Sequence, residues 1–179
     1  MRKKLFYMLF TSAILMGCGE ANKPELTKEE KQRNIEELQT KLYSDKQLFN
    51  DSVALVVIEA YDQYATDFVD DDLSADYLFK AGEVSLALNQ AMRSVEYFKR
   101  VCKQYPRHEK ASISLFLQAY IYDNHINDDK MAEGFYREFI EKFPKHDMIK
   151  DAEFSIGNLG KSDEQLIKEF EAKQIKEEA

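Results

Sequence analysis

The stretch SVEYFKRVCKQYPRH, residues 94–108, decides how this chain is built, because it recurs further along as AEGFYREFIEKFPKH, residues 132–146. Both copies place a small residue, apolar or aromatic residues at helical spacing, and an aromatic–proline pair at the same positions. Proline lacks a backbone N–H and disfavours helix in the residue before it, so Pro106 and Pro144 predict a helix end in each copy. A fixed period of about 20–50 residues is typical of proteins built from stacked supersecondary repeats.

A partial third copy precedes these two. When Val57 is aligned with Ser94, the upstream segment has apolar and aromatic residues at the same spacing as the copy at 94–108. These upstream residues are Val57, Tyr61, Tyr64 and Phe68. The repeat also extends upstream of the quoted stretch, because Ala81 and Ala119 are separated by the same period as Pro106 and Pro144. A repeat of this length holds two helices, which predicts stacked helical hairpins.

Apolar residues at helical spacing continue along most of the chain, and only 6 glycines and 3 prolines argue against an all-β chain rich in tight turns. Two capping boxes, Thr27 with Glu30 and Ser162 with Gln165, mark helix starts. We find no convincing strand, so the sequence predicts an all-α fold. The expected helices span residues 27–44, 51–68, 75–88, 91–104, 110–123, 129–142, 145–159 and 162–170.

The N-terminus has the pattern of an export leader. Basic residues at positions 2–4 precede an apolar run over residues 5–17, which is shorter than the roughly 20 residues that span a bilayer. The run ends at a small residue, Gly17, followed by Cys18. An ordinary signal peptide with a chance cysteine, or a buried apolar helix, is the alternative interpretation.

The charge balance bears on the class of partner. The chain has 25 Lys and Arg against 33 Asp and Glu, a formal net charge of −8. Binding to nucleic acid needs clustered cations that neutralise phosphates, so we predict no nucleic-acid partner. Hydrophobic residues make up 44% of the chain, enough for a core, and two cysteines cannot form a disulfide-dense scaffold.

The repeated residues resemble the tetratricopeptide repeat, whose pattern is a bulky residue and a small pair in the first helix, then a small residue, an aromatic residue and a terminal proline in the second. The matching residues are Leu78, Ala81, Gly82, Ser94, Phe98 and Pro106 in one copy, and Phe116, Ala119, Tyr120, Ala132, Tyr136 and Pro144 in the next. This resemblance implies a right-handed superhelix of tetratricopeptide-like helix hairpins. The chain departs from the pattern in lacking tryptophan, in having Tyr120 for the usual glycine, and in having Val69 where a third proline would fall.

The residues around Cys18 resemble the lipobox of bacterial lipoproteins, in which the cysteine is lipidated and becomes the first residue of the mature chain. The repeat is longer than the standard one, and in this it is similar to repeats of envelope lipoproteins, including the tetratricopeptide component of the outer-membrane barrel-assembly machinery. Residues 154–170 look like the C-terminal end of small tetratricopeptide lipoproteins of Bacteroidetes-type bacteria. We therefore expect a lipoprotein signal peptide (1–17), a lipidated cysteine and tether (18–26), a tetratricopeptide-like helical repeat domain (27–170) and a charged tail (171–179) that frays. Gly19 after the cysteine implies an outer-membrane address, facing the periplasm.

In tetratricopeptide arrays, the first helix of each pair lines a concave face where peptides of partner proteins bind. Its mixed acidic and apolar character suits a basic–apolar peptide. The alternative is that these side chains are solvated, or packed against the helix at 51–68. By register, the residues that we expect to face the groove are Asp76, Phe79, Glu83, Ser114, Leu117, Ile121, Asn124 and His125.

Other reactive side chains have structural explanations. His108 and His146 occupy the same position in successive repeats, each shortly after a proline, which indicates a turn or helix-cap role. Cys102 has no evident base partner, so it is expected to be a small buried residue. Two acidic runs, 70–72 and 127–129, lack the spaced ligands of a calcium loop and precede expected helices, where acids complement the helix dipole. We expect no catalytic residue, metal or cofactor.

These features predict a non-enzymatic protein-binding scaffold, anchored by lipid in the bacterial cell envelope and acting in outer-membrane or cell-wall biogenesis. An accessory lipoprotein of an outer-membrane uptake complex is the alternative within the binding class. A small envelope enzyme and a purely structural or self-associating protein are alternatives from other classes.

Overall fold

A computed structural model describes residues 26–44 and 50–177. The expected signal peptide, Cys18 and most of the tether lie outside the described residues. Within the described ranges the chain is helical and has no strand, which confirms the predicted all-α class. None of the described helices is both long and apolar enough to cross a membrane.

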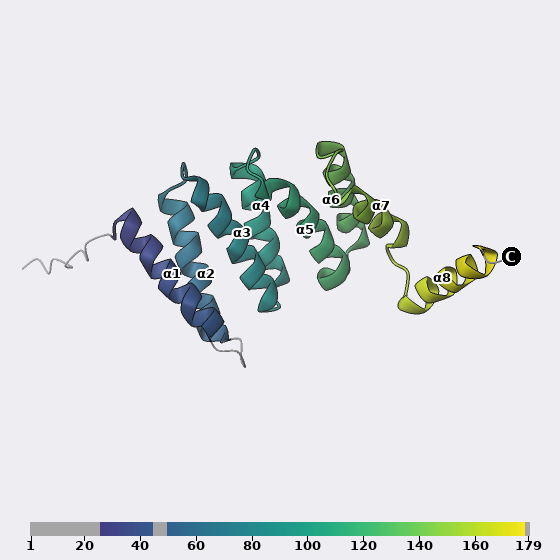
Figure 1. Cartoon of the computed structure of the whole chain (residues 1–179), viewed down its shortest axis with the longest axis horizontal. Helices are drawn as coiled ribbons and strands as arrows, with labels where there is room; N and C mark the ends of the chain where they lie inside the picture. The colour runs from purple at the N-terminus through teal and green to yellow at the C-terminus, as the bar shows by residue number, and fades with distance from the viewer. Residues whose placement is uncertain (1–25, 45–49, 178–179) are drawn as a thin grey trace, which may run out of the picture.

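The helices form antiparallel hairpins that stand side by side in one row, from α1 to α7 (Figure 1). Each packs mainly on the helices before and after it in sequence, as in a repeat protein. In chain order the elements are α1 (Lys28–Ser44), α2 (Asp51–Asp67), α3 (Asp72–Ala87), α4 (Ala91–Gln104), α5 (Lys110–Ile121), the π-helix η1 (Tyr122–Ile126), α6 (Asp129–Lys142), α7 (Ile149–Asn158) and α8 (Asp163–Glu177).

The small residues of the repeat let paired helices approach closely. Gly82 of α3 faces Phe98 of α4 so tightly that a Cβ atom at Gly82 would lie 2.7 Å from the Phe98 ring. Beside it, Ser94 Oγ donates a 2.8 Å hydrogen bond to the Gly82 carbonyl. Ala119 and Ala132 are fully buried at the matching α5–α6 contact. Small side chains at these positions therefore allow the close approach of the two helices in each hairpin.

The first hairpin is tied together by polar contacts as well as by its core. Gln32 Nε2 of α1 donates a 2.8 Å hydrogen bond to the Tyr64 hydroxyl of α2, and that hydroxyl donates to Asp71 Oδ2 at 2.7 Å. Lys31 forms an ion pair with Asp67 across the same interface. Because these groups are partly buried, losing one partner leaves the other without its hydrogen bond.

Three predicted helix boundaries are wrong. Helix α3 begins at Asp72 rather than at residue 75, because the Asp71 side chain caps it by accepting from Leu73 N at 3.1 Å. Helix α7 begins at Ile149 rather than at residue 145, since the turn after Pro144 occupies the intervening residues. Helix α8 continues to Glu177, so most of the expected charged tail is helical.

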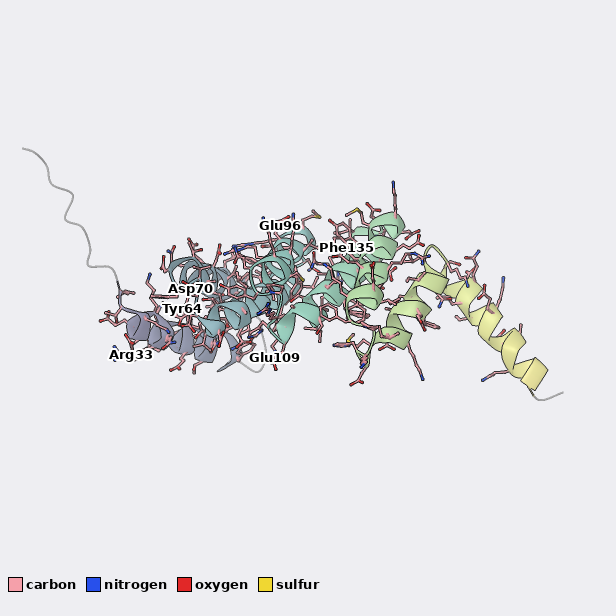
Figure 2. The ribbon with its side chains drawn as sticks, turned by 90° about the horizontal axis from the view of Figure 1, so that it is seen from above. Arg33, Tyr64, Asp70, Glu96, Glu109 and Phe135 are labelled. Atoms are coloured by element: carbon pink, nitrogen blue, oxygen red, sulfur yellow. The ribbon has the colours of Figure 1, made fainter. Side chains whose placement is uncertain are left out.

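The last helix leaves the row. Figures 1 and 2, which view the chain at right angles, both show α8 pointing away from the hairpins and lying beside none of them. The helix follows the turn that contains Gly160, whose φ of +71° favours glycine. The described row therefore ends at α7, and one side of α7 is not covered by the helix that follows it.

Candidate functional site

The predicted groove residues divide into exposed and buried ones. Glu83, Asn124 and His125 are exposed, and Asp76 and Leu117 are partly buried. These five positions remain candidates for a binding face. Phe79, Ser114 and Ile121, however, are buried, and assigning them to an open groove was wrong.

The reason lies in how α5 sits against α3. The Phe79 ring packs on Phe98 with ring centroids 5.4 Å apart, and the Lys110 ammonium of α5 lies 5.4 Å from the Phe79 ring centroid. Register alone places Phe79 on the inner face of α3, but the following hairpin covers that part of the face. A charged residue at Phe79 would therefore disrupt the core rather than probe a binding surface.

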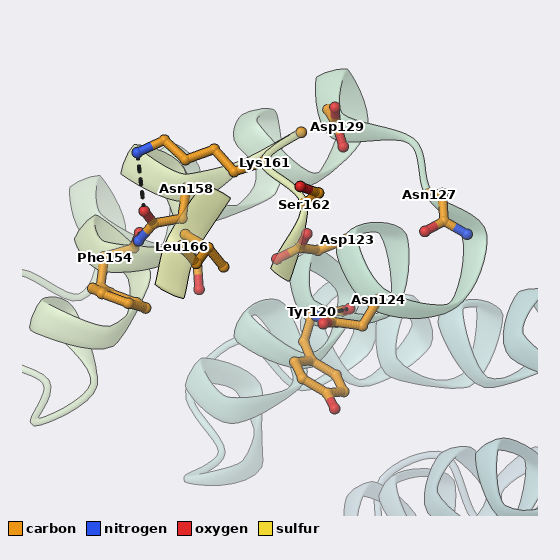
Figure 3. Close-up of a pocket in the computed structure, with 12 residues that line it drawn as sticks. Tyr120, Asp123, Asn124, Asn127, Asp129, Phe154, Asn158, Lys161, Ser162 and Leu166 are labelled. Carbon is orange, nitrogen blue, oxygen red and sulfur yellow. Dashed lines mark hydrogen bonds between the residues drawn. The ribbon is translucent and has the colours of Figure 1, made fainter. Parts of the chain in front are cut away.

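A large cavity lies at the C-terminal end of the row, where the end of α5, η1 and α7 meet the turn before α8 (Figure 3). Its volume is about 680 Å³. We call it the C-terminal cavity. Its wall combines the Tyr120 and Phe154 rings with the carboxylates of Asp123 and Asp129. Asn124, from the predicted groove, also lines it, so the cavity continues the predicted face toward the end of the row.

A π-helical turn shapes this cavity. Residues 122–126 form η1, and Asn127 ends it in the left-handed conformation with φ of 58°. The Tyr122 ring stacks on Phe135 of α6, with centroids 5.4 Å apart and planes 11° apart. In the preceding repeat the equivalent helix, α3, is α-helical to its end at Ala87, and there the residue equivalent to Asp123 is the buried Ser85. Single π turns are often found at functional sites, which makes this end of the row the better candidate.

The cavity wall is negatively charged. Asp123 accepts a 3.3 Å hydrogen bond from the Tyr136 hydroxyl. Burial, and to a lesser extent the nearby Asp129 carboxylate, raise the pKa of Asp123 above its ordinary value. Among the described residues no cation forms an ion pair with either carboxylate, and Lys161 of the same wall is paired with Glu169 at 2.8 Å. This arrangement suits a cationic group supplied by a ligand.

Phe154 is the exposed aromatic residue of this site, and its exposure departs from the repeat. The residues at the same position in the two preceding repeats, Leu78 and Phe116, are 0% and 7% exposed, whereas Phe154 is 69% exposed. Phe116 is covered by Tyr136 and Phe139 of α6, both at 5.4 Å between ring centroids. None of the described helices covers Phe154 in this way. The sequence signal that we missed is Gln174, which falls on the position of Tyr136 one repeat later, where an aromatic residue would continue the pattern.

A second hollow adjoins the first on the α8 side. It has a volume of about 530 Å³ and lies between α7 and α8, with Phe154, Leu166 and Ile167 as its apolar wall and Glu169 and Glu171 at its edge. We call it the α7–α8 groove. Phe154, Asn158 and Leu166 line both hollows, so the two form one continuous surface.

The remaining sequence candidates have structural roles. His108 Nδ1 accepts from Lys110 N, and His146 Nδ1 accepts from Met148 N, both at 3.2 Å, which confirms the turn role for both histidines. Asp71 and Asp128 cap α3 and α6, which confirms the assignment of the acidic runs to helix starts. Burial raises the pKa of Cys102 to about 11, so its thiol is protonated at neutral pH.

Within the described ranges, no three His, Cys, Asp or Glu side chains gather as a metal site would require. Serine–histidine or cysteine–histidine contacts of the kind that activate a nucleophile are likewise absent from the hydrogen bonds of the described residues. What the site does present is an exposed ring, further apolar side chains and carboxylates. Those groups are suited to binding another molecule.

Comparison with known proteins agrees with the repeat architecture. The family model described as "Tetratricopeptide repeat" matches residues 76–108 and 114–146. No curated protein and no solved structure matches the chain. The two matched segments coincide with the α3–α4 and α5–α6 hairpins. Such repeats are typically protein-interaction modules rather than enzymes, and two segments of this chain match the model of that repeat.

Proposed function

We propose that this chain is a lipid-anchored scaffold that binds another protein in the bacterial cell envelope, in outer-membrane or cell-wall biogenesis. The observation that carries the binding role is the open end of the repeat row. There the C-terminal cavity and the α7–α8 groove join in one surface that exposes Phe154 beside the carboxylates of Asp123 and Asp129. Exposed apolar surface of this kind marks protein-interaction sites.

The address is supported by the sequence from Met1 to Cys18. A short apolar run after basic residues, followed by Gly17 and Cys18, has the order of a lipoprotein leader. Acyl chains on Cys18 would hold the protein at a membrane without a spanning helix, since two or more chains give stable anchoring. The net charge of −8 makes attraction to anionic headgroups an unsuitable alternative.

A photo-crosslinking experiment in cells tests the proposal. A photoreactive amino acid is placed at Asn124, which is exposed in the C-terminal cavity, and as a control at Met92, which is 55% exposed on α4 away from it. We expect an adduct with one envelope protein at Asn124 and none at Met92, identified by mass spectrometry. In the Cys18→Ala variant, both the membrane fraction and the adduct should be lost.

Three results would each overturn a part of the proposal. Equal amounts of adduct at Asn124 and Met92, or no adduct at either position, would contradict the proposal that a partner protein binds at this end of the row. A Cys18→Ala variant that stays in the membrane fraction and keeps the adduct would overturn the lipid anchor and leave the scaffold role. An uptake transporter as the captured partner would place the protein in the alternative, accessory uptake class.

A further inference from the structure

We infer that the surface formed by the C-terminal cavity and the α7–α8 groove receives an amphipathic helix of a partner protein, with an apolar stripe flanked by lysine or arginine. This inference rests on the proposed protein-binding function and names the kind of segment that is bound. It places the contact at the end of the repeat row rather than along the inner face of α3 and α5.

The repeat itself indicates that the occupant is a helix. In the α3–α4 hairpin and again in the α5–α6 hairpin, the position of Phe154 is covered by the second helix of the pair. For Phe116 the covering atoms are two aromatic rings of α6, one helical turn apart at Tyr136 and Phe139. On α7 the equivalent residue, Phe154, stays exposed, because α8 points away from the row and does not cover it (Figures 1 and 2). An extended peptide would not supply apolar side chains at this helical spacing.

Apolar residues of both α7 and α8 line the surface and would contribute most of the affinity for a partner helix. Phe154 of α7 is 69% exposed and Ile167 of α8 is 57% exposed, and partly buried Leu166 lines both hollows. Figure 3 shows Phe154 and Leu166 on the same side of the cavity. A partner helix that covers them removes an aromatic ring and two aliphatic side chains from water. Buried aromatic anchors of this kind dominate binding free energies.

The charges on the surface select a basic partner. Asp123 and Asp129 line the C-terminal cavity and form no ion pair among the described residues, and Glu171 lies at the edge of the α7–α8 groove. Lys161 is a cation of the cavity wall, and Glu169 already pairs with it at 2.8 Å. A helix with lysine or arginine beside its apolar stripe would therefore meet carboxylates on both flanks.

The same charges argue against a second copy of this chain as the occupant. The segment that a second copy would offer is α8, which holds five acidic and three basic residues and would bring like charge to an acidic surface. The chain's own α8 is directed away by the turn before it. Gly160 has φ of +71°, Ser162 and Gln165 form a reciprocal capping box at 2.9 and 3.3 Å, and Lys161 bridges to Glu169.

Peptide binding to the purified lipidated protein in detergent tests the inference. The probe is a fluorescent peptide of about 18 residues with leucines at helical spacing i, i+3, i+4 and i+7 and lysines on both flanks. One control peptide keeps the leucines and replaces each lysine by glutamate. Another has the same composition with the leucine spacing scrambled. We expect the lysine probe to bind at least about tenfold more tightly than either control.

Matched variants locate the site. Phe154→Glu should weaken binding of the lysine probe by about tenfold or more, whereas Met92→Glu, a similarly exposed apolar position on α4, should leave it unchanged. Replacing both Asp123 and Asp129 by asparagine should weaken the lysine probe and narrow its advantage over the glutamate peptide. Circular dichroism of each variant shows that the fold is kept.

Each contrary result overturns the inference in a distinct way. Equal affinity for the lysine and glutamate peptides would contradict the preference for a basic partner helix. Loss of binding with both Phe154→Glu and Met92→Glu would contradict the location of the binding site at Phe154. Sedimentation that shows a dimer abolished by Phe154→Glu would make a second copy the occupant. If cellular crosslinking from Asn124 still captures a partner in a Phe154→Glu background, the scaffold function stands and the docking of a partner helix on Phe154 is contradicted.

Discussion

Phe116 and Phe154 occupy the same position in successive repeats, yet the first is 7% exposed and the second 69%. The difference arises from the helix that follows each of them. Helix α6 folds back over Phe116, whereas α8 leaves the row and does not cover Phe154. One ring therefore stabilises the fold, and its repeat counterpart is available to a partner.

This contrast predicts that the same substitution, phenylalanine to alanine, has a large effect on the free energy of unfolding at one position and a small effect at the other. Phe116→Ala should lower the free energy of unfolding by about 3–5 kcal/mol, because it leaves a cavity among buried rings. Phe154→Ala should change it by about 0.5 kcal/mol or less, as at other surface positions. Urea denaturation followed by circular dichroism measures both. If Phe154→Ala destabilises the protein as much as Phe116→Ala, then α8 or a second copy covers Phe154 in solution.

The close contact of α3 with α4 predicts the effect of a single methyl group. Gly82→Ala should destabilise the protein by about 1–3 kcal/mol, because the new Cβ would lie 2.7 Å from the fully buried Phe98 ring. Gly134→Ala is the matched control in α6, where a Cβ meets nothing within 4 Å. There the better helix propensity of alanine should stabilise the protein by about 0.5–1 kcal/mol. A neutral Gly82→Ala variant would mean that the hairpins are packed less tightly than described.

Much of the fold follows from the sequence because each repeat reproduces the same packing. Proline after an aromatic residue ends α4 and α6, and small residues at Gly82 and Ser94 mark where helices cross closely. The helix starts were predicted less well. Asp71 caps α3 one turn earlier than the apolar spacing suggests, since a cap depends on one side-chain hydrogen bond rather than on periodicity.

The site could be predicted only in part. Register assigns both Asn124 and Phe79 to the groove. In the structure Asn124 is exposed and lines the C-terminal cavity, whereas Phe79 is buried under α5. The π turn at 122–126 could not be predicted from the sequence, because a single π turn adds one residue to one helical turn and produces no repeating pattern of apolar residues. The exposure of Phe154 depends on the direction of α8, which is set by the turn at Gly160.

The raised pKa of Asp123 predicts a pH-dependent difference in stability. A carboxyl whose pKa is higher in the folded state holds its proton more tightly there, so ionisation at rising pH costs the folded state stability. Asp123→Asn keeps an acceptor for the Tyr136 hydroxyl and cannot ionise. The variant should therefore gain stability relative to the parent protein between pH 3 and pH 7. Urea unfolding at both values measures the gain. If the difference in unfolding free energy between the variant and the parent protein is constant with pH, or becomes smaller toward pH 7, the raised pKa of Asp123 is contradicted.

The partly buried thiol of Cys102, near Pro106, allows a chemical test of how tightly α4 and α5 pack. Its Sγ lies 3.4 Å from the Ala111 carbonyl and from Gln118 Nε2, and burial raises its pKa to about 11. Only the thiolate reacts with alkylating agents, and an unperturbed cysteine has a pKa of about 8.5. In the Cys18→Ala variant, where Cys102 is the single thiol, iodoacetamide at pH 8 should label the folded protein about a hundredfold more slowly than the urea-unfolded chain. Comparable labelling rates in both states would show that α4 and α5 separate readily near Cys102. The thiol would then be accessible to alkylation in the folded protein, which the packed structure does not allow.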